Sequence, residues 1–504
     1  MMHGEQLPDW AALAPALSLV AAAFVLFALD LIDPDSENRL MLVVVAATGA
    51  ITSLAFTVWY LLAGTGAEEG VGLFNANLVV DGLGLFFAAI IGSVVLLVSI
   101  ASYEYLEGHP HQAEYYSLVL LAGTGMVMVG FANSFVTAFI SIELVSLPSY
   151  ALVGSLKTNR GSTEAGLKYF LIGALSSAIF VYGISLIYVA TGSLQFDAVL
   201  AAFDDGAIEG AEGILGLGVL MVLGGVAFKI AAVPFHFWAP DAYEGAPATI
   251  SAFVSSASKA AGFVMGIRIF LEVFTHEVVT DAIDWVVLLQ VLAIVTMTVA
   301  NFAALKQDRV KRILAYSSIA HAGYVLIALA ALTGYSGAEG IDHNLVLGAG
   351  LAHLLVYGFM NTGAFLFIAL AEYWEVGRHV KDYHGLAKQA PFACAAMTVF
   401  LFSLAGLFGG GFLTKFFLLW ATIEGGVGVL AVALVLNSVI ALFYYARIVR
   451  ALWFEEPATD LEITRHPVGL YAAIVVAALM TILLLPGLAY VLDFADTAAD
   501  VITN

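Results

Sequence analysis

Long apolar runs recur from one end of the chain to the other, and most are long enough to cross a lipid bilayer as a helix. Of the 504 residues, 62% are hydrophobic and only 11% are charged. A soluble domain carries about 25% charged residues, whereas a membrane-spanning helix needs about 20 consecutive, mostly apolar residues. The sequence therefore predicts an all-α polytopic membrane protein embedded in a lipid bilayer.

Fourteen membrane-spanning segments are expected, separated by short connectors rich in Gly, Pro, Asp and Glu. Residues 1–10 contain no Lys or Arg, so the first segment is predicted to be a retained helix and not a cleaved signal. Connector 193–210 is longer, and residues 196–200 within it are expected to form a small interfacial helix. The fourteen segments are 10–32, 40–62, 83–104, 115–131, 134–155, 164–192, 211–233, 248–274, 280–304, 313–332, 345–372, 391–421, 426–446 and 467–492.

The basic residues predict how these segments run through the membrane, because Lys and Arg accumulate in cytoplasmic loops. Of the 18 Lys and Arg residues, 13 fall in odd-numbered loops, none in even-numbered loops and five inside segments. This alternation predicts a plasma-membrane protein with both termini outside. The loop residues are Arg39, Lys157, Arg160, Lys306, Arg309, Lys311, Arg312, Arg378, Lys381, Lys388, Arg447, Arg450 and Arg465.

The acidic residues lie mostly in loops and tails and give a net charge of −21. Such charges usually form a solvated surface, so no acidic ligand and no nucleic acid is expected as a partner. The single cysteine, Cys394, excludes an internal disulfide. No paired Cys/His spacing, phosphate loop or dinucleotide fingerprint is present. The chain is therefore expected to hold no metal, cofactor or redox centre of its own.

Four ionisable side chains lie well inside predicted apolar helices. Glu143 lies in FISIELVSLP, Lys229 in GGVAFK, Lys259 in SSASKAA and Lys415 in GGFLTK. An ionisable group in hydrocarbon costs at least about 2.5–3.5 kcal/mol on insertion scales, so it usually faces a partner or a wet cavity on an ion or proton pathway. A purely structural role is the less favoured alternative for these four.

Four further residues inside segments have weaker claims to a place on such a pathway. Lys168 lies near the cytoplasmic end of its segment, where a lysine can extend its amine to the interface. A structural role is equally favoured for Lys168 and Arg268, and Arg268 is not retained as a candidate. His321 is a candidate proton relay, but a hydrogen-bonded packing role has equal weight for it and more weight for His353.

The motif Gly-Gly-x-x-x-Lys occurs twice, at 224–229 and at 410–415. The two copies lie five segments apart, which is the expectation for inverted repeats with glycine-interrupted helices at matching positions. Segments 4–8 (111–275) and segments 9–13 (276–455) are therefore predicted to be the repeats, with broken helices in segments 7 and 12. Residues 1–110 are predicted to form helices 1–3, and residues 456–504 to form helix 14 and an acidic tail.

Buried lysines favour proton transfer over sodium binding. Burial disfavours the charged form of an amine, and a nearby carboxylate restores it. A movable Glu–Lys pair can therefore load and release a proton, whereas a protonated lysine cannot coordinate a cation. This predicts a proton relay through Glu143, Lys229, Lys259 and Lys415, with Lys168 and His321 as further candidate members.

Three long runs resemble the antiporter-like proton-channel subunits of respiratory complex I, the NADH–quinone oxidoreductase. They are PFHFWAPDAYEGAP at 234–247, STEAGLKYF at 162–170 and KRILAYSSIAH at 311–321. The runs YEGAP and STEAGLKYF are characteristic of the subunit N branch of that family. The resemblance covers about residues 75–455.

The resemblance implies fourteen helices with inverted repeats and a role for each buried charge. Glu143 would pair with Lys229, Lys259 would connect two half-channels, and Lys415 would lie toward the exit. Electron transfer, with NADH or another donor, FMN, iron–sulfur clusters and a quinone, would belong to sister subunits, and other membrane subunits would be the partners. Ferredoxin and reduced deazaflavin remain open as donors.

Segment 12 departs from the family pattern. The family usually has proline after Ser-Leu-Ala-Gly, whereas here residues 403–406 continue into Leu407, Phe408 and three glycines. The helix break is therefore expected to depend on glycine. A subunit of a multisubunit sodium/proton antiporter, which needs no redox partner, is the alternative function.

Overall fold

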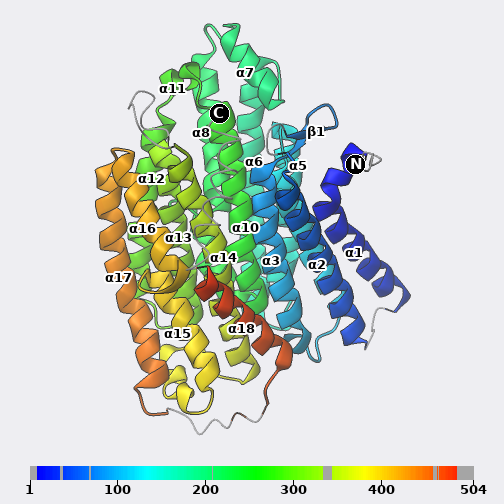
Figure 1. The fold of residues 1–504 in the computed structure, drawn as a ribbon, viewed down its shortest axis with the longest axis vertical. Helices are drawn as coiled ribbons and strands as arrows, with labels where there is room; N and C mark the ends of the chain where they lie inside the picture. The colour runs from blue at the N-terminus through cyan, green and yellow to red at the C-terminus, as the bar shows by residue number, and fades with distance from the viewer. Residues whose placement is uncertain are drawn as a thin grey trace.

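The chain forms a bundle of long helices, two of them interrupted, joined by short loops (Figure 1). The computed structural model describes residues 8–33, 38–66, 70–206, 208–332, 343–457, 463 and 465–484. Thirteen helices within these residues are long and apolar enough to cross a membrane, and a fourteenth, α18, is shorter. The predicted all-α polytopic membrane fold is confirmed.

The long helices match the fourteen predicted segments in order. They are α1 (Ala14–Ile32), α2 (Arg39–Ala63), α3 (Gly82–Tyr105), α4 (Gln112–Gly130), α5 (Phe135–Val153), α6 (Arg160–Thr191), α8 (Glu212–Lys229), α10 (Ala248–Ile267), α12 (Trp285–Leu305), α13 (Val310–Leu332), α14 (His343–Tyr373), α15 (Pro391–Ala405) with α16 (Gly409–Glu424), α17 (Gly428–Trp453) and α18 (Val468–Leu483). Segment 14 was expected to extend to residue 492, and its last part lies outside the described residues.

Short elements cap and connect this bundle. The small helix expected near 196–200 is present as α7 (Phe196–Asp204), so that prediction is confirmed. The two strands form one antiparallel hairpin in which Val71 faces Val80. The short elements are η1 (Asp9–Leu13), β1 (Val71–Leu73), β2 (Leu78–Val80), α7, α9 (Trp238–Gly245), the π-helical turn η2 (Arg268–Val273), α11 (Glu277–Ala282), η3 (Val380–Tyr383) and η4 (Leu386–Lys388).

Polar residues begin several of the membrane helices, because the first N–H groups of a helix need acceptors. Asp81 accepts a hydrogen bond from the Gly84 N–H at the start of α3, and Ser134 accepts one from the Thr137 N–H at the start of α5. Asp284 starts α12 in the same way. These caps place helix starts at the ends of the apolar runs.

The two ends of the bundle differ in composition. One end carries Lys157, Arg160, Arg309, Lys381 and Arg447 in or beside its loops and is called the basic end here. The other end carries β1, α7 and α11 and is called the hairpin end (Figure 1, top). All thirteen basic residues that the sequence analysis assigned to odd-numbered loops fall in connectors that meet the basic end or in the helix turns beside them.

Helix α10 forms the centre of the bundle. Its most apolar stretch is completely buried, whereas that of α6 is only 33% buried and faces outward. α10 packs against α3, α4, α13 and α14, so it contacts helices of both predicted repeats. The lysine of α10 therefore lies where the two halves of the chain meet.

Two of the membrane segments are interrupted, as predicted. α8 ends at Lys229, and residues 230–237 cross to the short helix α9 without forming a helix. α15 ends at Gly406, whose φ of +82° lies in the left-handed region that glycine adopts without strain. The expectation that glycine breaks segment 12 is confirmed.

The two Gly-Gly pairs, however, do not both mark a break. Gly224 and Gly225 lie inside α8, and Gly225 lets that helix pack closely against Phe180 of α6. Gly410 and Gly411 lie in the first turn of α16, directly after the break. The expectation of glycine-interrupted helices at matching positions is therefore wrong for segment 7, because there the chain leaves the helix after the lysine.

Candidate functional site

Glu143 and Lys229 approach each other but are held by different serines. Lys229, 4% exposed at the end of α8, donates a hydrogen bond to the Ser146 hydroxyl at 3.0 Å. Glu143, on the same face of α5, accepts a hydrogen bond from Ser177 of α6. Within the described residues no ion pair joins the acid to the amine, so the structure holds them in an unpaired arrangement.

A glycine on the central helix makes room for Lys229. A Cβ atom at Gly262 of α10 would lie 3.0 Å from Lys229 Cγ and 2.9 Å from the Ile230 side chain. Real Cβ contacts are almost always longer, so a larger residue would displace the lysine. Residue 262 therefore allows α8 and α10 to bring Lys229 close to the helix that carries Lys259.

Lys259 reaches from α10 to α13 and is only 1% exposed. Its amine donates to the Ser318 hydroxyl at 2.6 Å and also to the Ser318 carbonyl oxygen. The face of the Tyr357 ring lies 6.0 Å from the same nitrogen. Polar contacts replace the hydration shell that the amine loses on burial.

Two histidines continue this line toward α16. His321 lies one helical turn beyond Ser318 on α13, and its Nδ1 lies 3.1 Å from Nε2 of His353 on α14. The other nitrogen of His353 lies 2.9 Å from the Thr414 hydroxyl, next to Lys415. Both rings are buried. His353 therefore connects His321 with the second lysine-bearing break.

The sequence favours a packing role for His353 over a relay. A single histidine in an apolar helix has no sequence signal that distinguishes a relay from a packing residue. In the structure its ring stacks on that of His321, with the two planes 6° apart, in addition to its contacts with His321 and Thr414.

Lys415 lies in the second turn of α16, and its side chain folds back over the break of segment 12. Its amine donates to the Leu404 carbonyl oxygen at 2.8 Å and lies 3.5 Å from the Ser438 hydroxyl. A Cβ atom at Gly406 would lie 2.7 Å from Lys415 Cδ, so glycine is needed there for space as well as for φ. Lys415 and Ser438 also line a cavity of about 240 Å³ whose other walls are mostly apolar.

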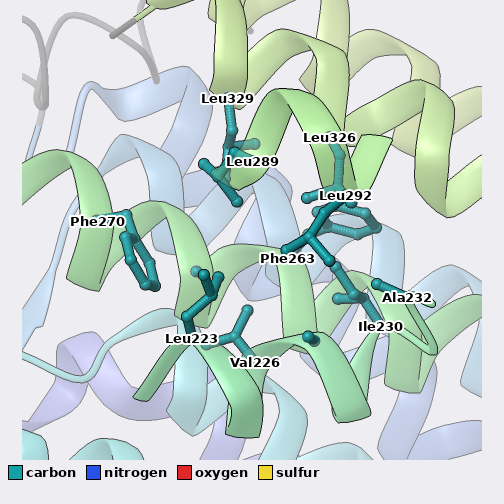
Figure 2. Close-up of a pocket in the computed structure, with 12 residues that line it drawn as sticks. Leu223, Val226, Ile230, Ala232, Phe263, Phe270, Leu289, Leu292, Leu326 and Leu329 are labelled. Carbon is teal, nitrogen blue, oxygen red and sulfur yellow. The ribbon is translucent and has the colours of Figure 1, made fainter. Parts of the chain in front are cut away.

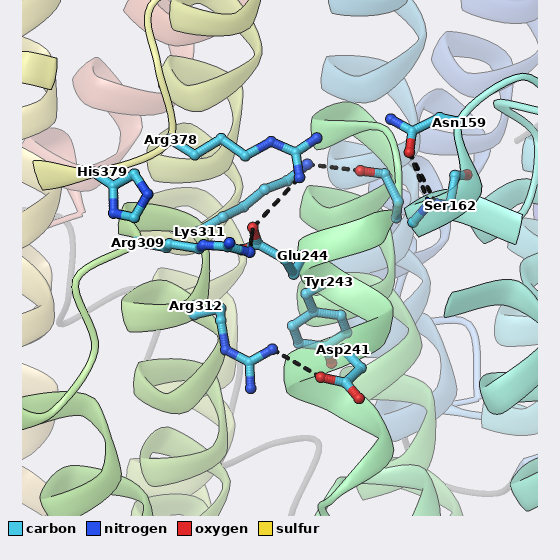
Figure 3. A network of polar contacts seen from close by, with 12 residues as sticks. Asn159, Ser162, Asp241, Tyr243, Glu244, Arg309, Lys311, Arg312, Arg378 and His379 are labelled. Atoms are coloured by element: carbon cyan, nitrogen blue, oxygen red, sulfur yellow. Dashed lines mark hydrogen bonds and ion pairs between the residues drawn. The ribbon is translucent and has the colours of Figure 1, made fainter. Parts of the chain in front are cut away.

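Lys168 lies apart from this line, at the basic end. Its side chain is 44% exposed and pairs with Glu164 at 2.8 Å and with Asp241 of α9 at 2.9 Å. Asp241 also accepts from Arg312 of α13 at 2.8 Å (Figure 3). The structure therefore places Lys168 in an ion-pair network on the surface, as its alternative interpretation predicted.

The network extends along α9 and connects the two predicted repeats. Glu244 lies 3.3 Å from Arg309 and 3.5 Å from Arg378, and both arginines come from the second half of the chain (Figure 3). Lys311 donates to the Ala246 carbonyl oxygen at 2.7 Å and pairs with Glu372 at 2.9 Å. Four cationic side chains thus hold the two carboxylates of α9, which fixes the segment after the α8 break.

These ion pairs make a testable contribution to stability. Burial would raise the pKa of Asp241, but hydrogen bonds from Arg312 and Lys168 outweigh it and hold that pKa below its ordinary value. Because the folded pKa is lowered, the stabilisation is present above the ordinary pKa of about 3.9 and is lost as pH falls through the lowered value. At pH 7 we expect a coupling energy of about 0.5–1 kcal/mol between Asp241→Asn and Arg312→Gln, because the pair is partly exposed. A double-mutant cycle on thermal unfolding of the purified protein measures it, and strictly additive effects would contradict the pairing.

Apolar packing closes the space between Lys229 and the hairpin end. Twelve residues of α8, the segment after it, α10, η2, α12 and α13 surround a void of about 10 Å³, and Leu223, Phe263 and Leu326 are among them (Figure 2). That volume holds at most about one water, and apolar cavities of this kind stay dry. This void therefore offers no water-filled path for a proton.

Comparison with known proteins identifies related chains. The sequence profile of the family described as NADH:quinone oxidoreductase/Mrp antiporter, transmembrane, matches residues 132–441. F(420)H(2) dehydrogenase subunit N of Methanosarcina mazei is 38% identical over 480 residues, covering 92% of this chain and 93% of that protein. NADH-quinone oxidoreductase subunit N 2 of Solibacter usitatus is 38% identical over 473 residues, covering 93% and 92%.

The fold has a counterpart among solved structures. A chain of respiratory complex I from Thermus thermophilus superposes with a TM-score of 0.76 and 28% identity, over 96% of this chain and 99% of that one. Within the described residues no group of three or more His, Cys, Asp or Glu side chains is placed to hold a metal ion.

Proposed function

The chain belongs to the NADH:quinone oxidoreductase/Mrp antiporter membrane family, and from that premise we propose that it is the proton-translocating subunit N of a respiratory, complex I-like oxidoreductase. The observation that carries the proposal is its 38% identity, over more than nine-tenths of both chains, to subunit N of F(420)H(2) dehydrogenase and of NADH-quinone oxidoreductase. The buried lysines supply the chemistry, because such groups in a membrane helix usually mark a proton or ion path.

We propose that the proton path runs laterally through the middle of the bundle. Glu143 and Lys229 form the switch at its first end, Lys259 and His321 form its centre, and Lys415 forms its second end. His353 joins the centre to Lys415 through Thr414. The serines that hold Glu143 and Lys229 apart support this role, because a switch needs a stable unpaired state.

The redox chemistry belongs to other subunits in this proposal. They would carry FMN, iron–sulfur clusters and the quinone site, and they would accept electrons from NADH or from reduced deazaflavin, the donors that the names of the two relatives indicate. Further antiporter-like membrane subunits would pack beside this chain. Proton movement here would then be coupled to quinone reduction elsewhere in the complex.

We also propose that residues 111–275 and 276–455 are inverted repeats, flanked by 1–110 and 456–504. Both repeats contribute one interrupted segment and one buried lysine, Lys229 and Lys415. The basic end would face the cytoplasm of a cell with this chain in its plasma membrane, and both termini would lie outside. A membrane-impermeant reagent that labels basic-end loops only from the cytoplasmic side would support this orientation, and labelling from outside would contradict it.

Purification of the tagged chain tests the function. We expect iron–sulfur and quinone-site subunits to copurify, and donor oxidation in sealed vesicles to acidify one side of the membrane. The alternative is a subunit of a multisubunit sodium/proton antiporter, which the family description also includes. Copurification of small antiporter subunits without any redox subunit would favour that alternative and contradict the proposal.

A further inference from the structure

Lys415, like Lys229 and Lys259, has no acidic side chain paired with it within the described residues, unlike Arg268 and Lys168. Arg268 pairs with Asp81 and Glu272, and Lys168 with Glu164 and Asp241. The Lys415 amine instead contacts the Leu404 carbonyl oxygen and, at a longer distance, the Ser438 hydroxyl. It also lies over the face of the Tyr324 ring, whose centroid is 4.4 Å from Nζ. A ring face within about 6 Å attracts a cation, and more strongly where water is excluded.

Tyr324 is fixed in place through its hydroxyl. Its hydroxyl accepts a hydrogen bond from the Asn301 amide of α12 at 3.1 Å. That amide also donates to Asn437 of α17 at 3.1 Å, and its oxygen accepts from Tyr444 at 3.0 Å. Asn301, Tyr324 and Tyr444 are fully buried. An amide pair in the core is costly unless its bonds are satisfied, and here the bonds orient one aromatic ring.

The same ring also borders the histidine line. The ring centroids of Tyr324 and His321 lie 5.1 Å apart in an edge-to-face arrangement, with the planes at 78°. Tyr324 therefore lies between the proposed relay centre and Lys415. A simple packing role would explain its burial, but it would not explain why a buried amide of α12 holds its hydroxyl while its ring face covers an amine.

We propose that Tyr324 is a positioning residue that stabilises the protonated form of Lys415. The Asn301–Asn437 amide pair keeps the Tyr324 ring in the orientation that faces Lys415. At the second break, the Tyr324 ring stabilises the protonated Lys415 as the Glu143 carboxylate would stabilise the protonated Lys229. The inference rests on the proposed function, because it requires Lys415 to carry a proton during turnover.

The other ionisable groups near Lys415 define what a pH measurement reports. α13 contributes His321 and Tyr324, and α14 contributes His353. α15 and α17 contribute the Leu404 carbonyl oxygen and the Ser438 hydroxyl. The one ionisable residue of α18, Tyr471, stacks near Trp374 and not near Lys415. Neither histidine can carry a negative charge that would attract the Lys415 amine. The face of the Tyr324 ring is therefore the attractive group that a substitution should weaken.

The test measures proton pumping against pH in sealed vesicles that contain the assembled complex. Replacing residue 324 by Phe and then by Phe with one, two and three fluorines keeps its shape and weakens the ring face stepwise. We expect the alkaline limb of the profile to move to lower pH with each fluorine, by about one pH unit across the series. An alkaline limb that stays at the position of the Phe variant throughout the series would overturn the proposal.

Two substitutions separate this result from the proposed function. Tyr324→Leu should move the alkaline limb at least as far as the trifluorinated variant, whereas Tyr316→Leu, the same change two turns away on α13, should not move it. Lys415→Ala should abolish the pumping whose pH profile is measured. If Lys415→Ala pumped normally, the relay assignment would fail; if it abolished pumping while the fluorinated series stayed flat, only the role of Tyr324 would fail.

Discussion

Replacing Lys229 by alanine is expected to reduce proton pumping by at least about tenfold while the chain still assembles into its complex. A positioned proton-transfer group typically contributes about 10²–10⁴-fold to the rate of the step it serves. Lys229 donates to Ser146 alone among the described contacts, so its loss leaves no unpaired buried charge. The effect should therefore appear in pumping and in coupled quinone reduction, and not in the amount of assembled complex.

Glu143→Gln provides the complementary test. The amide keeps the shape of the carboxylate and still bonds Ser177, but it cannot take up a proton. We expect a loss of pumping similar to that of Lys229→Ala. Lys388→Ala is the matched control, since Lys388 is exposed at the basic end and pairs only with Glu456 in the described structure. Wild-type pumping by both switch variants in sealed vesicles would exclude these residues from the path.

The helices could be predicted because bilayer thickness sets a length that apolar runs must meet. The fourteen predicted segments correspond in order to the long helices, and the short α7 was also expected, whereas α9 and α11 were not. The end of segment 7 was harder, because residues 230–233 are as apolar as a helix interior. The chain nevertheless leaves the helix at Lys229, where Ala231 adopts a φ of +59°. Hydropathy does not record such backbone turns.

Buried lysines could be predicted because their cost in hydrocarbon is large. Their partners could not be predicted, because those partners are uncharged and distant in sequence. Ser146 lies 83 residues from Lys229, and Ser318 lies 59 residues from Lys259. Serine is common in packed membrane helices, so only the contact distinguishes these two from the rest. Asn301 and Asn437 are separated by 136 residues and carry no pattern in the sequence.

Arg268 shows the same limit for a charged residue. From the sequence, a structural role and a pathway role had equal weight for Arg268, and no partner could be named, since Asp81 lies 187 residues away. All five N–H groups of its guanidinium are bonded in the structure. Nε and Nη2 donate to the Gly130 carbonyl oxygen at 3.1 and 2.7 Å, and Nη1 and Nη2 donate to both oxygens of Asp81 at 2.7 and 2.6 Å. Nη1 also donates to Glu272 at 2.7 Å. No N–H is left to serve a proton path.

Because every N–H group of Arg268 is bonded, replacing this residue should have a large effect on stability. Arg268→Gln should lower the free energy of unfolding by about 3–5 kcal/mol, because it leaves Asp81, which is fully buried, without its counter-ion. The cluster joins the starts of α3 and η2 to the end of α4, so its loss should loosen the hairpin end. Thermal unfolding of the purified complex and its yield on a native gel measure this effect.

A paired substitution separates charge burial from side-chain loss. Combining Arg268→Met with Asp81→Asn removes the fully buried ion pair and leaves Glu272, whose side chain is 18% exposed, while the Asn oxygen can still cap α3 at Gly84. Replacing a buried ion pair by neutral side chains is often nearly neutral, so the double variant should recover a large part of the lost stability. Complex that does assemble with Arg268→Gln should pump at the wild-type rate per molecule, because the residue lies outside the relay. Normal stability of Arg268→Gln would contradict the cluster's role, and a pumping defect in assembled complex would return Arg268 to the proton path.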